Sequence, residues 1–134
     1  MILVDTNVLL SAAFDIADHR LAAQLLEQHI GSIAAPVLWR TEFVHVASKQ
    51  VRLGNLSLAE ALDAARQLEL VVTTDYALPS MGDALEVSAK YTTSGQDAIF
   101  LYWAIELATP LITRDRRLVN AAQGHAVLLA DYLA

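Results

Sequence analysis

The sequence predicts an α/β fold, a three-layer sandwich around a central, mostly parallel, five-stranded sheet. Five short apolar stretches alternate with segments of helical periodicity, which is typical of a parallel sheet covered by helices on both faces. The first stretch, MILV, is continuously apolar, as a strand buried on both faces usually is. The 5 Gly and 3 Pro residues fall between the periodic stretches, where they break them.

The strands are expected at the apolar stretches Ile2–Asp5, Ser32–Ala35, Glu69–Thr73, Leu111–Thr113 and Ala126–Leu129. Several helix starts have local signals. Pro36 is a good first-turn residue, Ser57 and Glu60 have the spacing of a capping box, and Ser94 begins a similar box. After a first helix from about Asn7, the expected helices are Leu21–His29, Val37–Val51, Ser57 to about Leu68, Pro79–Lys90, one that starts at Ser94, and Asp115–Asn120.

Length and composition indicate one domain over residues 1–134 with a sizeable core, since 55% of the residues are hydrophobic and mean hydropathy is +0.40. No apolar run reaches the ~18 residues of a membrane span. The N-terminus lacks the basic flank of a signal peptide. The absence of cysteine excludes disulfides and thiolate metal sites and is compatible with a reducing compartment. We therefore expect a cytoplasmic protein with no membrane partner.

The chain is acidic, with a net charge of −6 from 15 acidic and 9 basic side chains. This argues mildly against tight nonspecific nucleic-acid binding, which usually leaves a basic surface. Carboxylates gathered in one metal site would raise the acidic count, however, and bound cations would reverse the charge locally.

Four carboxylates are the candidate catalytic residues: Asp5, Glu42, Asp97 and Asp115. Asp5 and Asp115 follow predicted strands, and sites in parallel sheets form outside the carboxyl ends of the strands. Each residue also has a structural explanation. Asp5 and Asp115 can cap helices, Asp97 suits a first helical turn, and Glu42 can border an apolar face.

Taken together, the four acids favour a shared metal pocket. Converging carboxylates repel one another, and their pKa values rise unless cations compensate. Without thiolates, an oxygen-rich site suits Mg²⁺ or Mn²⁺. One or two such ions can activate a water and stabilise the leaving oxygen in phosphodiester cleavage.

Other chemistries fit less well. The sequence has no GxxxxGK[ST], GxGxxG or GxSxG motif, and its four histidines are scattered. Asn7 stands where an aspartyl-phosphate enzyme of the haloacid dehalogenase type needs a second Asp. A phosphoacceptor receiver domain shares the predicted architecture, and Asp75 follows the third apolar stretch. A receiver domain also needs a pair of acidic residues near the first strand, and this sequence has no such pair.

The motifs VDTNVLL, the Glu42 helix after Pro36, SGQDAIFLYWA and LITRDRRL make the chain resemble a PIN domain, specifically the toxin of a VapBC toxin–antitoxin pair. The resemblance implies a PIN-like α/β sandwich and a ribonuclease that uses Mg²⁺ or Mn²⁺. It also implies a homodimer inhibited by a VapB-type antitoxin. The implied site comprises the four acids, with Asp5 and Asp97 as metal ligands and with polar support from Thr6, Asn7 and Thr113.

Two positions depart from the family pattern. Gln96 stands where relatives often have an aromatic residue, and Arg114 where they often have a small one. The arginines of the RDRR segment either contact RNA phosphates or merely solvate a helix face. Lys49, Arg114 and Arg116 are the candidate RNA contacts. A catalytically silent PIN-like module that binds RNA or protein is the alternative to an enzyme.

Overall fold

The computed structural model describes residues 1–134 and contains one five-stranded sheet. The strands are β1 (Ile2–Val4), β2 (Ile33–Pro36), β3 (Thr74–Tyr76), β4 (Leu111–Thr113) and β5 (Ala126–Leu128). They lie in the order β3-β2-β1-β4-β5, and every neighbouring pair is parallel. The predicted α/β fold is confirmed, and the sheet is parallel throughout.

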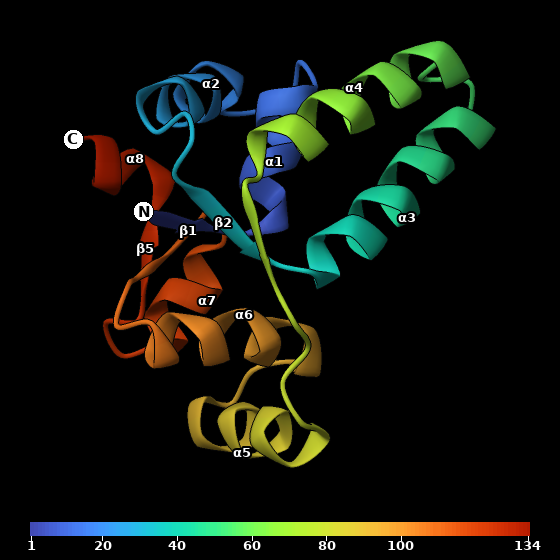
Figure 1. Ribbon diagram of the computed structural model, residues 1–134. Helices are drawn as coiled ribbons and strands as arrows, with labels where there is room; N and C mark the ends of the chain where they lie inside the picture. The colour runs from blue at the N-terminus through green and yellow to red at the C-terminus, as the bar shows by residue number, and fades with distance from the viewer.

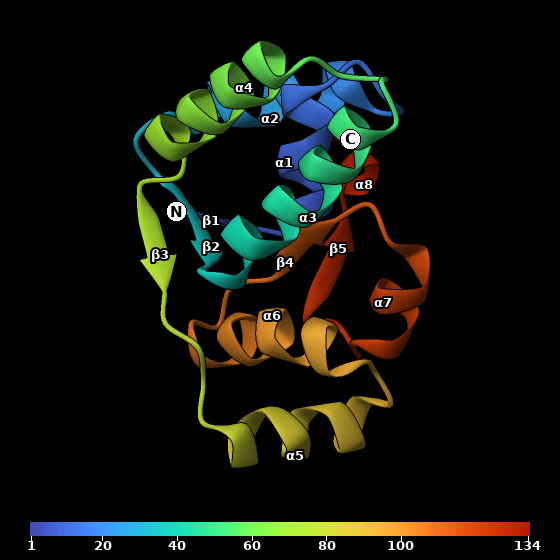
Figure 2. The same ribbon diagram turned by 90° about the vertical axis from the view of Figure 1, so that its right-hand side faces the viewer.

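Helices cover both faces of this sheet (Figures 1 and 2). They are α1 (Thr6–Ala13), α2 (His19–Gln28), α3 (Leu38–Arg52), α4 (Leu58–Val71), α5 (Met81–Tyr91), α6 (Gly95–Glu106), α7 (Arg116–Ala121) and α8 (Leu129–Leu133). The first four helices lie on one side of the sheet, and α5 and α6 lie on the other. No helix has the length and apolar character that crossing a membrane requires.

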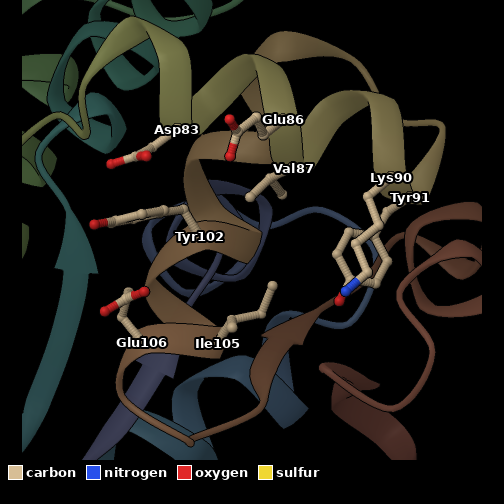
Figure 3. A pocket seen from close by; sticks show the side chains of 8 residues that line it. All are labelled: Asp83, Glu86, Val87, Lys90, Tyr91, Tyr102, Ile105 and Glu106. Carbon is tan, nitrogen blue, oxygen red and sulfur yellow. The ribbon is translucent and has the colours of Figure 1, made fainter.

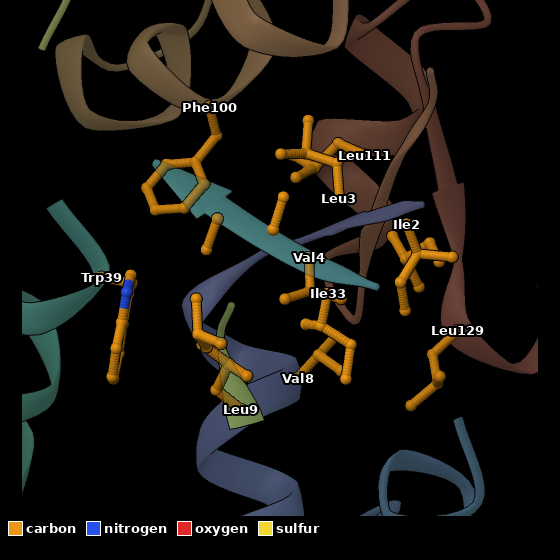
Figure 4. Packing of buried hydrophobic residues seen from close by; sticks show 14 of the residues in the cluster. Ile2, Leu3, Val4, Val8, Leu9, Ile33, Trp39, Phe100, Leu111 and Leu129 are labelled. Carbon is orange, nitrogen blue, oxygen red and sulfur yellow. The ribbon is translucent and has the colours of Figure 1, made fainter. Parts of the chain in front are cut away.

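The core is a cluster of 28 buried residues centred on β1. Leu3 and Val4 have no exposed surface, as expected for a middle strand whose two faces are both covered. Figure 4 shows Val8 and Leu9 of α1 on one side of β1 and Phe100 of α6 on the other. The chain therefore begins in the middle of the sheet, and the residue after β1 emerges at its centre.

The predicted third strand, Glu69–Thr73, is wrong. Helix α4 continues to Val71, and the strand β3 comes later, at Thr74–Tyr76. The apolar signal at the predicted position belongs to the last turn of α4 and its cap, where Leu68 and Val72 enter the core. Strand β3 is at the edge of the sheet, with Thr74 and Asp75 exposed and Tyr76 partly exposed, so its residues need not be apolar.

The register between β1 and β4 determines which residues meet at the carboxyl end of the sheet. Val4 pairs with Ile112, and the backbone N–H of Asp5 donates to the Ile112 carbonyl over 2.9 Å. Asp5 and Thr113 are therefore neighbours just beyond the last paired residues.

Candidate functional site

Asp5 lies buried between β1 and α1, with 9% of its surface exposed. It caps α1, because its Oδ1 accepts a hydrogen bond from the Thr6 N–H over 2.7 Å. Its Oδ2 accepts a second hydrogen bond, from the Thr113 hydroxyl, over 2.8 Å. Both carboxylate oxygens are thus held in place, one by the helix and one by the neighbouring strand.

The Thr113 hydroxyl joins the two strand ends. Besides donating to Asp5, it accepts hydrogen bonds from Asn7 Nδ2 and from the backbone N–H of Asp115, each over 3.1 Å. The Asn7 Oδ1 in turn accepts from the Arg114 N–H, also over 3.1 Å. This network fixes the β1–α1 junction against the β4–α7 junction.

Glu42 approaches the same place from α3. The Thr6 hydroxyl donates to Glu42 Oε1 over 2.6 Å. Partial burial raises the pKa of Glu42; the Thr6 hydrogen bond opposes this shift, and the charge of Asp97 adds to it. Arg40 does not pair with Glu42, because its guanidinium binds Glu69 and Asp75 instead.

Asp97 and Asp115 begin α6 and α7. The Asp97 N–H donates to the Ser94 hydroxyl over 3.1 Å. Partial burial raises the pKa of Asp97, and the charge of Asp115 contributes in the same direction. Asp115 caps α7 through Oδ1, which accepts from the Arg117 and Leu118 N–H groups over 2.9 and 3.3 Å. Both aspartates line one pocket of about 340 Å³.

Burial raises the pKa of Asp5 to about 7; the Thr113 hydrogen bond opposes this, and the charges of Glu42 and Asp97 reinforce it. The four predicted acids therefore interact electrostatically in a chain from Asp5 through Glu42 and Asp97 to Asp115. None of the three ion pairs in the structure includes any of them. These four carboxylates at the carboxyl edge of the sheet are therefore not held by ion pairs with cationic side chains.

The donor set fits a divalent cation of the Mg²⁺ or Mn²⁺ type, because it consists only of oxygens and includes a desolvated carboxylate without a cationic partner. The side chains are not yet arranged as ligands of one ion, since no group of three or more acidic or histidine side chains is placed to hold one. Mg²⁺ is usually bound through one or two carboxylates, with waters completing its coordination, so such an ion needs fewer protein ligands than that.

The candidate RNA contacts differ in their surroundings. The Arg114 guanidinium is engaged by Asp18 over 3.0 Å, whereas Arg116 and Lys49 are exposed. Lys49 lies two helical turns, about 10 Å, beyond Glu42 on α3. Arg117, the last arginine of the RDRR segment, is exposed as well and lines the pocket shared by Asp97 and Asp115. The sequence of that segment does not distinguish Arg117 from Arg116, because only the helix phase separates neighbouring arginines.

Two other features lie apart from these acids. Asp75, the residue that a receiver domain would use, is on β3, where it accepts hydrogen bonds from Trp39 Nε1 over 2.7 Å and from Arg40. A hollow of about 230 Å³ lies between α5 and α6 (Figure 3). Its lining includes Asp83, Glu86 and Glu106 but none of the predicted site residues.

A parallel α/β sheet with interacting carboxylates beyond the ends of adjacent strands is the architecture of a class of nucleases. Residues 2–124 match a family model described as PIN domain, and the chain belongs to the PIN domain family. PIN domains are generally metal-dependent nucleases.

Solved structures agree on the fold. The crystal structure of PAE2754 from Pyrobaculum aerophilum superposes with a TM-score of 0.78 at 22% sequence identity, over 98% of this chain and 92% of the other. No curated protein matches the sequence.

Proposed function

We propose that this protein is a metal-dependent endoribonuclease, and that it is the VapC-type toxin of a toxin–antitoxin pair. One observation carries the enzymatic part of the proposal. Asp5 is a buried carboxylate at the carboxyl end of the central strand, coupled to Glu42 and Asp97 and without any cationic partner. Such an arrangement is costly for folding alone, and functional sites are where such costs are found.

In this proposal Asp5 and Asp97 hold Mg²⁺ or Mn²⁺, and Glu42 and Asp115 complete the acidic site. The bound ion would supply an activated water and stabilise the leaving oxygen of the phosphodiester. Thr113 and the Thr6 N–H fix the orientation of the Asp5 carboxylate, as residues around metal ligands typically do. Asp115 keeps Oδ2 free of hydrogen bonds from the protein, since α7 uses only Oδ1.

The toxin role rests on the sequence resemblance, and exposed apolar surface supports the partners that it implies. Val44, Leu58 and Leu62 are 63%, 62% and 45% exposed, and they line an apolar groove of about 340 Å³ between α3 and α4. Apolar patches of this kind are typical of protein contacts. We expect contacts with a second copy in a homodimer and with a VapB-type antitoxin.

The test is cleavage of single-stranded RNA by the purified protein with Mg²⁺ or Mn²⁺. Asp5→Asn should lower the rate more than about 100-fold, because it replaces a metal ligand. Asp63→Asn, an equal charge change on the exposed face of α4, should leave the rate unchanged. Unchanged cleavage by Asp5→Asn would show that the assignment is wrong. RNA binding with neither metal binding nor cleavage would favour the silent module.

A further inference from the structure

The pocket that adjoins the acidic site has a composition of its own. We call it the α6–α7 pocket; it is lined by the turn 92–94, by Asp97 of α6, and by Asp115, Arg117 and the apolar Leu118 and Ala121 around α7. Its volume of about 340 Å³ is in the range of small-ligand pockets, about 300 to 1,000 Å³. Two of its lining residues, Asp97 and Asp115, belong to the acidic site. A ligand in this pocket would therefore lie next to the phosphodiester that the acidic site is proposed to cleave.

The wall formed by residues 92–94 is built before any ligand arrives. Thr92 ends α5 in the left-handed conformation, with φ of 55°. The Ser88 hydroxyl donates to the Thr93 carbonyl over 2.7 Å, and the Thr93 N–H donates back to the Ser88 carbonyl over 3.1 Å. Ser94 then caps α6. The turn is therefore held at both ends, and binding need not order it.

One cationic side chain on this pocket has no partner within the protein. Arg117 forms no ion pair, unlike Arg114, whose guanidinium is engaged by Asp18. Arg117 is exposed and lines the pocket together with Asp97 and Asp115. An unpaired guanidinium donor suits a phosphate.

We propose that the α6–α7 pocket binds the nucleotide adjacent to the phosphodiester that is cleaved, with Arg117 on the phosphate of that nucleotide. The inference rests on the proposed ribonuclease function, which supplies the substrate class. It assigns the phosphate contact to Arg117 and not to Arg114 or Arg116. A guanidinium can bind a phosphate with two parallel hydrogen bonds, which gives geometric specificity as well as attraction.

Fluorescence anisotropy with a short labelled single-stranded RNA in EDTA tests this without cleavage. Arg117→Gln should weaken binding at least about fivefold and reduce the slope of log K against log salt by about 0.7, the value for one phosphate contact on a single strand. Arg66→Gln, the same charge change on exposed α4, should match the wild type. The inference is overturned if Arg117→Gln behaves like Arg66→Gln, if Arg116→Gln loses the slope instead, or if the wild type does not bind. Arg117-dependent binding by a wild type that never cleaves with metal would contradict only the ribonuclease proposal.

Discussion

The Thr6 hydroxyl donates to Glu42 Oε1 over 2.6 Å, across 36 positions of sequence. Thr6 is the first residue of α1 and follows Asp5 directly, so this bond ties α3 to the junction that carries the buried aspartate. It also explains how a glutamate without a cationic partner is tolerated beside an apolar helix face, because a hydrogen bond to the charged form offsets part of its desolvation.

Thr6→Val should therefore lower RNA cleavage about 10- to 100-fold, the usual cost of removing a residue that orients a metal-site ligand. The fold should survive, since Val has a similar volume, with a loss of about 1 to 3 kcal/mol in the free energy of unfolding. Single-turnover cleavage and urea denaturation measure the two effects. Thr6→Ser keeps the hydroxyl and should restore most of the rate. A rate loss of equal size in Thr6→Ser would contradict a role for the hydrogen bond.

The stability of the metal-free protein should depend on pH through Asp5. Its pKa is about 7 in the folded protein against 3.8 for the free group, so the folded state binds this proton more tightly than the unfolded state. The resulting stabilisation is complete below pH 4 and is lost as pH rises through 7. The shift corresponds to roughly 4 kcal/mol at most. Asp5→Asn should show a flatter profile in urea denaturation from pH 4 to 8. Parallel profiles for the two proteins would refute the assignment.

Metal binding should strengthen over the same pH interval. An ion that binds the Asp5 carboxylate must displace its proton, so near pH 6 binding releases a proton and is weaker than at pH 8. Calorimetric titration with Mn²⁺ in two buffers of different ionisation enthalpy measures that release. Asp5→Asn should show neither the release nor the affinity. A metal affinity independent of pH would exclude Asp5 as a ligand.

Thr113→Val should destabilise the protein more than an ordinary buried hydroxyl deletion. Three partners lose their hydrogen bond at once, namely Asp5 Oδ2, Asn7 Nδ2 and the Asp115 N–H. We expect a loss of about 2 to 4 kcal/mol, because unpaired buried polar groups cost about 1 to 3 kcal/mol each and are not fully additive. Urea denaturation of Thr113→Val and of Thr113→Ser, which keeps the hydroxyl, compares their free energies of unfolding. Equal stability of the two variants would contradict the role of the shared hydroxyl.

The fold was largely predictable because its buried strands are apolar. MILV and Leu111–Thr113 are middle strands, and their composition reveals them. Strand β3 was misplaced because an edge strand has an open side and carries Thr and Asp, while the apolar residues before it complete a helix. The local sequence pattern cannot tell the end of a buried helix from a strand, because tertiary packing decides between them.

The placement of Asp5 and Asp115 beyond the ends of β1 and β4 was predictable from the sequence, but the individual contacts of the four acids were not. Asp5 and Asp115 each cap a helix, as their local sequence indicated, and each also belongs to the coupled cluster. The two roles are compatible, because a carboxylate has two oxygens and can serve both. The pairing of Arg114 with Asp18 joins residues 96 positions apart, so no local pattern indicates it.

The bond between Asp5 and Thr113 spans 108 positions of the chain. During translation Thr113 is therefore added 108 residues after Asp5, its hydrogen-bond partner. The acidic centre therefore cannot assemble on a nascent chain that stops short of β4. A product released by premature termination before β4 would therefore lack the hydrogen bond that orients Asp5.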